Sequence, residues 1–318
     1  MRKSLDTGAD LTRRTDFGLT SLIWQIYKRL RSYSAYVHGK LDRRDFLQAA
    51  QKFAFGGATA AGLLAALSPD FAIGQVIAKE DSRISNQWVE YSSPKGSASM
   101  RGYLVRPAGT PGPLPAVLVA HENRGLNPHI EDIARRLALA GYMAFAPDAL
   151  TPLGGYPGDE DKARQMFAQL DQTKTLEDFV VAAELLVGRS DCTGKMGVVG
   201  FCWGGGMAHR LAARLSILAA AVPFYGDSPA AAEAAKVKAP LLLHFADIDD
   251  RINKAWPTYE EALKAAGVSI AVHHYPGTQH GFNNDTTPRY NATAAAQAWE
   301  RTLAFFAGRL GSAVHPKA

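Results

Sequence analysis

The sequence predicts an α/β protein with one mostly parallel β-sheet that is covered by helices on both faces. From residue 86 onward, short apolar runs alternate with segments of helical periodicity, which is the order expected for strand–helix–strand crossovers. Several of these runs consist almost entirely of Ala, Val and Leu, as is typical of strands buried on both faces of a parallel sheet. No composition shift or fixed repeat interrupts this pattern, so we expect a single domain over residues 75–318.

The apolar runs predict eight strands. In chain order they are Gln87–Tyr91, Arg101–Val105, Ala116–Ala120, Tyr142–Ala146, Lys195–Val199, Ala219–Phe224, Pro240–Phe245 and Ile270–Tyr275. No helical segment separates the first two, so we expect them to form an antiparallel hairpin at one edge of the sheet. Helices are expected at Ile130–Ala140, Lys162–Leu170, Leu176–Val187, Gly205–Leu215, Lys254–Ala266 and Ala294–Leu310.

Charge separates residues 1–74 from the rest of the 318-residue chain, whose formal net charge is +5. Residues 1–44 hold ten Lys and Arg against four Asp and Glu. Only Lys52, Asp45 and Asp70 add charge before Gln75, so 24 charges of each sign remain from there on. A neutral domain without a basic stripe argues against a nucleic-acid partner.

Residues 1–74 have the features of an export leader. Arg43 and Arg44 precede Phe46 and Leu47, an uncharged run follows over residues 53–67, and small residues stand around residues 72–74. A basic region, an apolar region and a small-residue cleavage site occur in this order in export signals. The paired arginines resemble the twin-arginine signal, although Asp42 stands where Ser or Thr is usual.

We therefore expect the export machinery as a partner, and a periplasmic or membrane-associated location. The alternative is a cytoplasmic protein with an Ala-rich helix packed on the domain. Upstream, apolar residues from Leu19 to Leu30 follow helical spacing beside Lys28 and Arg29. That pattern fits either a helix on a membrane surface or a solvated helix.

Cys202 is the expected nucleophile. The strand at Lys195–Val199 runs into the sequence Gly-Phe-Cys-Trp-Gly-Gly, and a helical segment follows. A sharp strand-to-helix turn requires small residues on both sides of the nucleophile, and the helix N-terminus favours a thiolate and then an oxyanion. The alternative is a buried cysteine in a glycine-rich packing turn. Cys192 precedes the same strand, and the mostly extended residues between them place it too far from Cys202 to form a disulfide.

A base and an orienting acid follow later strands. His280 comes after the eighth expected strand, and Asp247, Asp249 and Asp250 follow the seventh. The chain order Cys, Asp, His is that of α/β-hydrolases, in which the His accepts the nucleophile's proton and the acid orients the His. Spacing alone does not choose among the three acids.

The loop after the third expected strand adds a second carboxylate. It reads His121-Glu122-Asn123-Arg124, and in α/β-hydrolases this loop and the residue after the nucleophile supply the oxyanion-hole N–H groups. Here these would be the backbone groups of Asn123 and Trp203. A carboxylate at the end of a buried strand needs a partner. We interpret Glu122 as lying beside the thiol, with an ion pair to Arg124 as the alternative.

Together, the motifs around Cys202, Glu122 and His280 resemble the dienelactone hydrolase family over roughly residues 86–310. The resemblance implies an α/β-hydrolase fold with an eight-stranded, mostly parallel sheet, and an enzyme that hydrolyses a small-molecule ester or lactone. It implies that Cys202 is the nucleophile, that Glu122 contacts it and controls its ionisation, and that His280 is the base. It also selects Asp249 as the catalytic acid.

Two features of the family are missing. The arginines that bind the substrate carboxylate have no counterpart, since residues 148–152 contain no arginine and the position four residues after His280 is Asn284. A carboxylated dienelactone is therefore not the expected substrate. Arg124 is the remaining candidate for a substrate contact.

The sequence leaves two alternative functions, a metal site and a binding protein. A metal site could draw on His121, His244, His273, His274 or His280. The sequence has no H-E-x-x-H or C-x-x-C spacing, so we expect neither a metal nor a cofactor. A non-catalytic binding protein on a hydrolase scaffold would have no need for a complete Cys–Asp–His set.

Overall fold

The computed structural model describes residues 35–36, 41, 43–51 and 69–311. The chain divides into two compact units, residues 1–68 and 69–318. In the first unit, helix α2 (Arg43–Gln51) begins at the paired arginines. The predicted helix at residues 19–30 and the apolar run at residues 53–67 lie outside the described residues. Within the described ranges, no helix combines the length and apolar character needed to cross a membrane.

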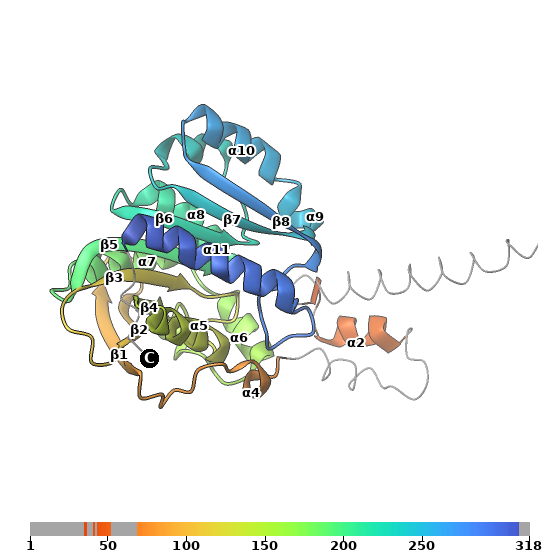
Figure 1. The fold of residues 1–318 in the computed structure, drawn as a ribbon. Helices are drawn as coiled ribbons and strands as arrows, with labels where there is room; N and C mark the ends of the chain where they lie inside the picture. The colour runs from red at the N-terminus through yellow and green to blue at the C-terminus, as the bar shows by residue number, and fades with distance from the viewer. Residues whose placement is uncertain (1–34, 37–40, 42, 52–68, 312–318) are drawn as a thin grey trace, which may run out of the picture. The chain divides into compact units, whose positions relative to one another are not determined.

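The second unit is built on an eight-stranded sheet in the order β1-β2-β4-β3-β5-β6-β7-β8 (Figure 1). The strands are β1 (Ile84–Ser93), β2 (Ala98–Pro107), β3 (Leu114–Ala120), β4 (Met143–Pro147), β5 (Cys192–Phe201), β6 (Leu218–Phe224), β7 (Leu241–Ile248) and β8 (Ile270–Gln279). Strand β2 is antiparallel to both β1 and β4, and all other neighbours are parallel. The predicted mostly parallel sheet with a hairpin at one edge is confirmed.

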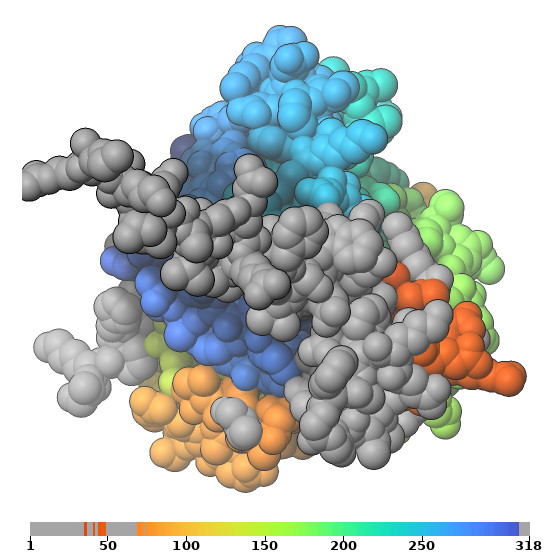
Figure 2. All heavy atoms as spheres, turned by 90° about the vertical axis from the view of Figure 1, so that its right-hand side faces the viewer, coloured from red at the N-terminus to blue at the C-terminus, as the bar shows by residue number. Residues whose placement is uncertain are grey.

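Helices cover both faces of the sheet. The helices of this unit are α4 (Phe71–Gly74), α5 (Pro128–Leu139), α6 (Glu160–Phe167), α7 (Gln172–Val187), α8 (Trp203–Arg214), α9 (Asp250–Asn253), α10 (Trp256–Ala265) and α11 (Ala292–Leu310). Apolar residues of α5 and α11 join one core cluster, and those of α7, α8 and α10 join the other. Strand β3 contributes to both clusters, because Val117 packs in the cluster with α5 and α11 and Leu118 packs in the other. Figure 2 shows the face on which α11 (blue) lies between the N-terminal part of this unit (orange) and the region of α9 and α10 (light blue).

Several predicted helices differ from the observed ones at their ends, as in Leu176–Val187, which begins at Gln172. The segment expected as a single helix at Lys254–Ala266 begins at Trp256, and the short helix α9 precedes it. Pro257 lies in the first turn of α10, where its missing N–H and fixed φ favour a helix start rather than a helix interior. A 3₁₀ helix at Ala231–Lys236 was not predicted.

The sheet brings five chain segments to one edge. Strands β3, β5, β6, β7 and β8 are parallel neighbours, and their pairing places Ala120 beside Gly200 and Phe201 beside Phe224. The residues that directly follow these strands therefore gather at a single edge, the usual position of a ligand site in an open α/β sheet.

Candidate active site

Cys202 lies at a strained turn between β5 and α8. Its backbone has φ 56° and ψ −114°, outside the regions that side-chain-bearing residues ordinarily adopt. The turn is held by hydrogen bonds from the Cys202 N–H to the Phe224 carbonyl (3.0 Å) and from the Gly205 N–H to the Cys202 carbonyl (3.0 Å). Such strain persists where the surrounding structure fixes it, often at functional sites.

The glycines on either side are required by close backbone packing. A Cβ atom on Gly200 would lie 1.9 Å from the Gly204 carbonyl oxygen. A Cβ atom on Gly204 would lie 2.1 Å from the Ala120 carbonyl oxygen at the end of β3. The first turn of α8 therefore packs directly against the end of the neighbouring strand, and no residue larger than glycine fits at either position.

His280 is held by Asp249. The His280 Nδ1 lies 2.5 Å from the Asp249 Oδ2, and both residues are buried. The other two acids have different surroundings, since the Asp247 carboxylate accepts from the Gly277 N–H (3.0 Å) and Asp250 begins α9. Tertiary contact thus resolves the choice that spacing left open.

Cys202 contributes to the pKa of His280. Burial lowers the pKa of His280, but the negative charge of Cys202 and hydrogen bonds to Cys202 and Asp249 raise this pKa to about 9. Because Asp249 occupies Nδ1, Nε2 is the ring nitrogen left to exchange a proton with Cys202. The raised pKa keeps a proton on the ring.

Glu122 lies one strand away from Cys202. It follows Ala120 by two residues, as Cys202 follows Gly200, and Ala120 and Gly200 are register partners in β3 and β5. Glu122 is 9% exposed, and its Oε2 accepts a hydrogen bond from the Asn284 side-chain amide (2.9 Å). The predicted position beside the thiol is therefore consistent with the sheet register.

Arg124 has a carboxylate partner on α6. Its Nε lies 3.5 Å from the Glu160 Oε2, and its NH1 donates to the Asn123 side-chain oxygen (2.6 Å). The Arg124 side chain is nearly buried, so this guanidinium is neutralised locally by Glu160.

His121 braces the loop that carries Glu122. Its Nε2 accepts from the Ala149 N–H (3.1 Å), so its Nδ1 carries the proton and donates to the Glu122 carbonyl (2.6 Å). Burial lowers the pKa of His121, in keeping with a neutral ring. The ring also stacks on the Trp203 indole at a centroid distance of 5.2 Å. This bracing role of His121 was not predicted from the sequence, where His121 was a candidate metal ligand.

Tyr225 is a site residue that the sequence analysis missed. It directly follows β6, has a positive φ of 39°, and its ring centroid lies 5.0 Å from that of His280. Burial, followed by the charges of Glu122 and Cys202, raises the pKa of Tyr225 well above its ordinary value. Within the described residues, its buried hydroxyl has no hydrogen-bond partner. The sequence did contain a signal for Tyr225, because this residue directly follows a predicted buried strand, as the other site residues do.

The remaining candidates do not assemble into a metal centre. Among the residues that the structure describes, no group of three His, Cys, Asp or Glu side chains could hold a metal ion. His244 instead bonds the Tyr275 hydroxyl (2.8 Å) and the Thr302 hydroxyl (3.1 Å) in the core. Cys192 and Cys202 are both free and buried, which confirms the expectation that they form no disulfide.

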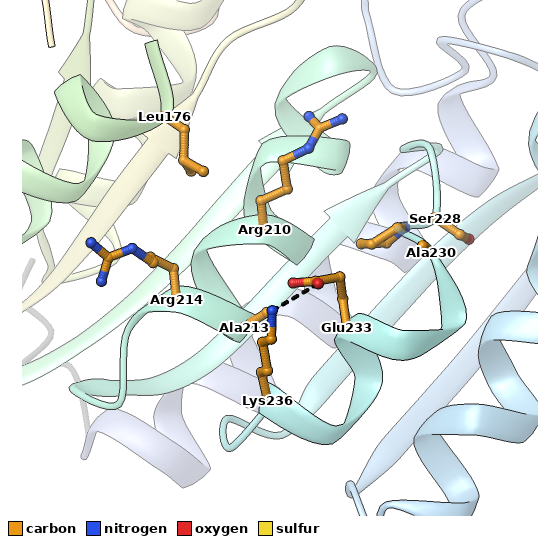
Figure 3. Close-up of a pocket in the computed structure, with 9 residues that line it drawn as sticks. Leu176, Arg210, Ala213, Arg214, Ser228, Ala230, Glu233 and Lys236 are labelled. Carbon is orange, nitrogen blue, oxygen red and sulfur yellow. Dashed lines mark hydrogen bonds and ion pairs between the residues drawn. The ribbon is translucent and has the colours of Figure 1, made fainter. Parts of the chain in front are cut away.

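A pocket of about 420 Å³ lies apart from these residues, between α7, α8 and the 3₁₀ helix (Figure 3). Its lining residues are Leu176, Arg210, Ala213, Arg214, Ser228, Pro229, Ala230, Glu233 and Lys236. Lys236 pairs with Glu233 (2.8 Å), and Arg214 pairs with Glu177 (3.6 Å). The pocket lining does not include Cys202, Asp249 or His280.

The sheet order and the residues after its strands define a hydrolase of the α/β-hydrolase fold. Comparison with known proteins gives the family. The dienelactone hydrolase family model matches residues 100–310, and the chain belongs to that family. It is an enzyme of the class that hydrolyses carboxylic esters or lactones, as the sequence predicted.

Individual relatives agree with this assignment. A putative carboxymethylenebutenolidase of Escherichia coli is 34% identical over 230 residues, which are 68% of this chain and 84% of the relative. A putative hydrolase fragment, YghX, of the same species is 50% identical over 115 residues, 36% of this chain and 98% of the fragment. The crystal structure of a putative dienelactone hydrolase from Klebsiella pneumoniae has a TM-score of 0.63 and 30% identity, covering 70% of this chain and 99% of that one.

Proposed function

We propose that this hydrolase cleaves its ester or lactone through a covalent thioester on Cys202, with His280 and Asp249 completing a triad. One observation supports the proposal most strongly. Asp249 holds one nitrogen of His280, while the charge of Cys202 raises the pKa of the imidazole to about 9. A buried ion pair of thiolate and imidazolium is the resting state that such chemistry uses.

The first half of the reaction forms the thioester. The Cys202 thiolate attacks the carbonyl carbon, and the carbonyl oxygen becomes an oxyanion. Collapse of this intermediate expels the alcohol portion, which takes the proton from His280 Nε2. In a lactone, the expelled alcohol stays attached through the acyl chain.

The second half returns the enzyme to its starting state. His280, now neutral, accepts a proton from water, and the resulting hydroxide attacks the thioester carbonyl. Collapse breaks the carbon–sulfur bond and releases a carboxylic acid, leaving the Cys202 thiolate and the protonated His280. Asp249 keeps the proton-bearing Nδ1 in place throughout.

Backbone N–H groups of Asn123 and Trp203 are the proposed oxyanion donors. Trp203 is the first residue of α8, and the first N–H groups of a helix have no partner within the helix. Asn123 lies on the loop in which the His121 ring is hydrogen-bonded to the Glu122 carbonyl. Together with the positive end of the α8 dipole, these groups would stabilise negative charge on the oxygen.

We propose a neutral acyl group for the substrate. Arg124 is the candidate substrate contact in the loop after β3, and Glu160 neutralises its charge. Asn284 is uncharged and is already engaged by Glu122. Arg124 can still shape the site or donate to a substrate oxygen without supplying a net positive charge.

The test uses the full chain with an activated aryl ester, an aliphatic lactone and a carboxylated dienelactone. Cys202→Ala and prior treatment with iodoacetamide should each lower turnover by ~10³-fold or more. Cys192→Ala is the matched control and should retain activity. We expect turnover of the two neutral substrates and little of the carboxylated one. Activity that survives in Cys202→Ala would refute the mechanism. Binding without turnover in the parent would favour a non-catalytic binding protein.

We also propose that residues 1–74 direct export by the twin-arginine route. The paired arginines at the start of α2 and the charge contrast between leader and domain support this proposal. Replacing both Arg43 and Arg44 with Lys should move the protein from the periplasmic or membrane fraction to the cytoplasm. An unchanged distribution in cell fractionation would contradict it.

A further inference from the structure

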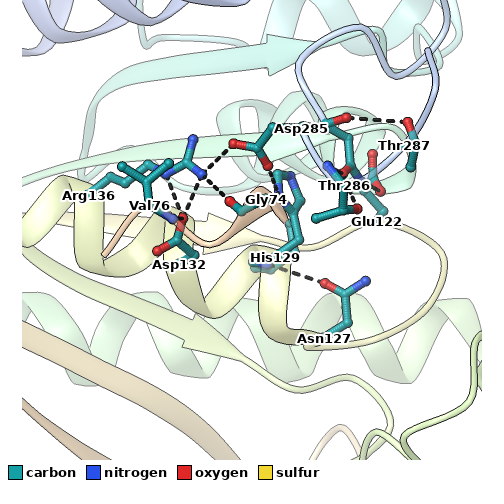
Figure 4. Close-up of polar contacts among 12 residues, drawn as sticks. Gly74, Val76, Glu122, Asn127, His129, Asp132, Arg136, Asp285, Thr286 and Thr287 are labelled. Atoms are coloured by element: carbon teal, nitrogen blue, oxygen red, sulfur yellow. Dashed lines mark hydrogen bonds and ion pairs between the residues drawn. The ribbon is translucent and has the colours of Figure 1, made fainter. Parts of the chain in front are cut away.

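Residues 69–77, here called the strap, belong to the second unit and are hydrogen-bonded to it. The strap contains the short helix α4 and lies against α5 and against the loop after β8 (Figure 4). Its Asp70 N–H donates to the Thr286 carbonyl (2.7 Å) in that loop. The strap includes residues 72–74, which the sequence analysis assigned to the end of the leader.

Two charged side chains of α5 fasten the strap. The Asp132 carboxylate accepts from the N–H groups of Val76 (3.1 Å) and Ile77 (2.8 Å). Arg136 donates to the Gly74 carbonyl (2.9 Å) and pairs with Asp285 (2.5 Å). Since Asp285 belongs to the loop after β8, Arg136 ties the strap and this loop to the same helix.

Gly74 packs tightly on Thr286. A Cβ atom at Gly74 would lie 2.4 Å from the Thr286 Cγ2, 2.9 Å from an Asp285 carboxylate oxygen and 3.0 Å from the Thr286 backbone nitrogen. The strap therefore sets the position of Thr286 both by a backbone hydrogen bond and by direct contact.

Thr286 in turn fixes the amide that holds Glu122. The Thr286 N–H (3.1 Å) and hydroxyl (2.6 Å) both donate to the Asn284 side-chain oxygen. With its oxygen saturated in this way, the Asn284 amide must present its NH₂ group on the opposite side. There it donates to the Glu122 carboxylate at 2.9 Å.

We propose that the strap positions the Glu122 carboxylate next to Cys202 through Thr286 and Asn284. Gly74, Thr286 and Asn284 are positioning residues of the reaction, and the inference rests on the proposed function of Cys202. One consequence concerns the leader. Cleavage within residues 72–74 would cut the strap at the residue that packs on Thr286, so it would alter the geometry at Glu122.

The main test compares two glycine-to-alanine variants in the full chain. Gly74→Ala adds a Cβ that clashes with the Thr286 side chain. Gly308→Ala in α11 adds a Cβ that has no neighbouring atom within 4 Å. Neither position has a positive φ. We expect Gly74→Ala to lower kcat roughly tenfold with little change in KM, and to change the rate at which iodoacetamide alkylates Cys202. Gly308→Ala should match the parent in all three quantities.

A second pair of variants tests the hydrogen bond itself. Thr286→Val removes the hydroxyl but keeps the Cγ2 that contacts Gly74. Thr287→Val is the control, because the Thr287 hydroxyl donates to the Asn284 backbone carbonyl and not to its side chain. Thr286→Val should reproduce the effects of Gly74→Ala, while Thr286→Ser, which restores the hydroxyl, should recover most of kcat.

The outcomes separate this inference from the proposed mechanism. Alkylation of Cys202 does not require turnover, so its rate reports on the site even if the mechanism is wrong. If Gly74→Ala and Thr286→Val change only thermal stability, the strap has a purely structural role and the inference is overturned. If Gly74→Ala does not fold, the Thr286 variants decide. Activity surviving in Cys202→Ala would overturn the mechanism instead.

Discussion

The Asn284 side-chain amide donates to the Glu122 carboxylate across 2.9 Å, although the two residues are 162 positions apart in the chain. The Asn284 side chain is an uncharged partner for this carboxylate. An amide orients the carboxylate without cancelling its charge. Glu122 is therefore held in one orientation by this hydrogen bond.

Removing this amide should affect both stability and activity. Asn284→Ala leaves a buried carboxylate oxygen without its donor, which we expect to cost about 1–3 kcal/mol in the free energy of unfolding. We expect kcat to fall roughly tenfold, because Glu122 is no longer held. Urea unfolding and steady-state kinetics measure the two effects. Asn283→Ala removes a buried neighbour that makes no hydrogen bond to Glu122, and equal effects in both variants would contradict the assigned role.

The pKa of His280 sets an alkaline limit on activity. Because this pKa is raised to about 9, the imidazole keeps its proton below that pH and loses it above. The protonated form donates to the leaving group, so kcat should fall as the pH rises through about 9. NMR titration of the His280 ring measures the pKa directly. Cys202→Ala should lower it, since the charge of Cys202 is the largest cause that raises it. An unchanged pKa in that variant would show that the two groups are not coupled.

The Tyr225 hydroxyl should contribute to catalysis at the expense of stability. It is buried without a partner in the described part of the chain, so Tyr225→Phe should leave the melting temperature unchanged or raise it. The same change should lower kcat roughly tenfold, because the hydroxyl is a donor near the charges of Glu122 and Cys202. Tyr259→Phe is the control, since the Tyr259 hydroxyl is also buried without a partner among the described residues but lies on α10. Equal kcat in both variants would contradict a catalytic role.

His209 should make the fold sensitive to acid. Burial and the charge of Arg210 lower its pKa to about 3, whereas an unfolded histidine titrates near 6.5. The unfolded state therefore binds more protons below pH 6.5, and the free energy of unfolding should decrease as the pH falls from there. This single residue contributes up to about 2 kcal/mol of that loss by pH 5.

Replacing His209 tests this directly. Both ring nitrogens are buried without a hydrogen-bond partner among the described residues, and the ring packs edge-on against Tyr259. His209→Phe keeps an aromatic ring and removes the titration, so it should lose less stability than the parent between pH 7 and pH 5. Urea unfolding at the two pH values provides the comparison. Parallel losses in parent and variant would show that other groups cause the acid sensitivity.

The sequence by itself determined the features that depend on local patterns. Apolar runs and helical periodicity predicted all eight strands and their mostly parallel arrangement, because burial on both sheet faces imposes a composition that can be read along the chain. Gly200 and Gly204 predicted the turn at Cys202, because backbone contacts at that turn exclude a Cβ atom. The order of Cys202, Asp249 and His280 was visible because each follows a predicted strand.

Only the tertiary structure decided which of these residues meet. It paired His280 with Asp249, which the family resemblance had selected but strand spacing had not. It also joined Arg124 to Glu160 and placed Tyr225 in the site. Residues 69–77 also bind to the second unit, whereas the sequence predicted that residues 69–74 belong to the leader. These outcomes depend on contacts between distant segments, whose geometry is set by the packing of helices on the sheet. Local periodicity carries no record of such contacts, so the sequence predicted the elements and their chemistry but not these partners.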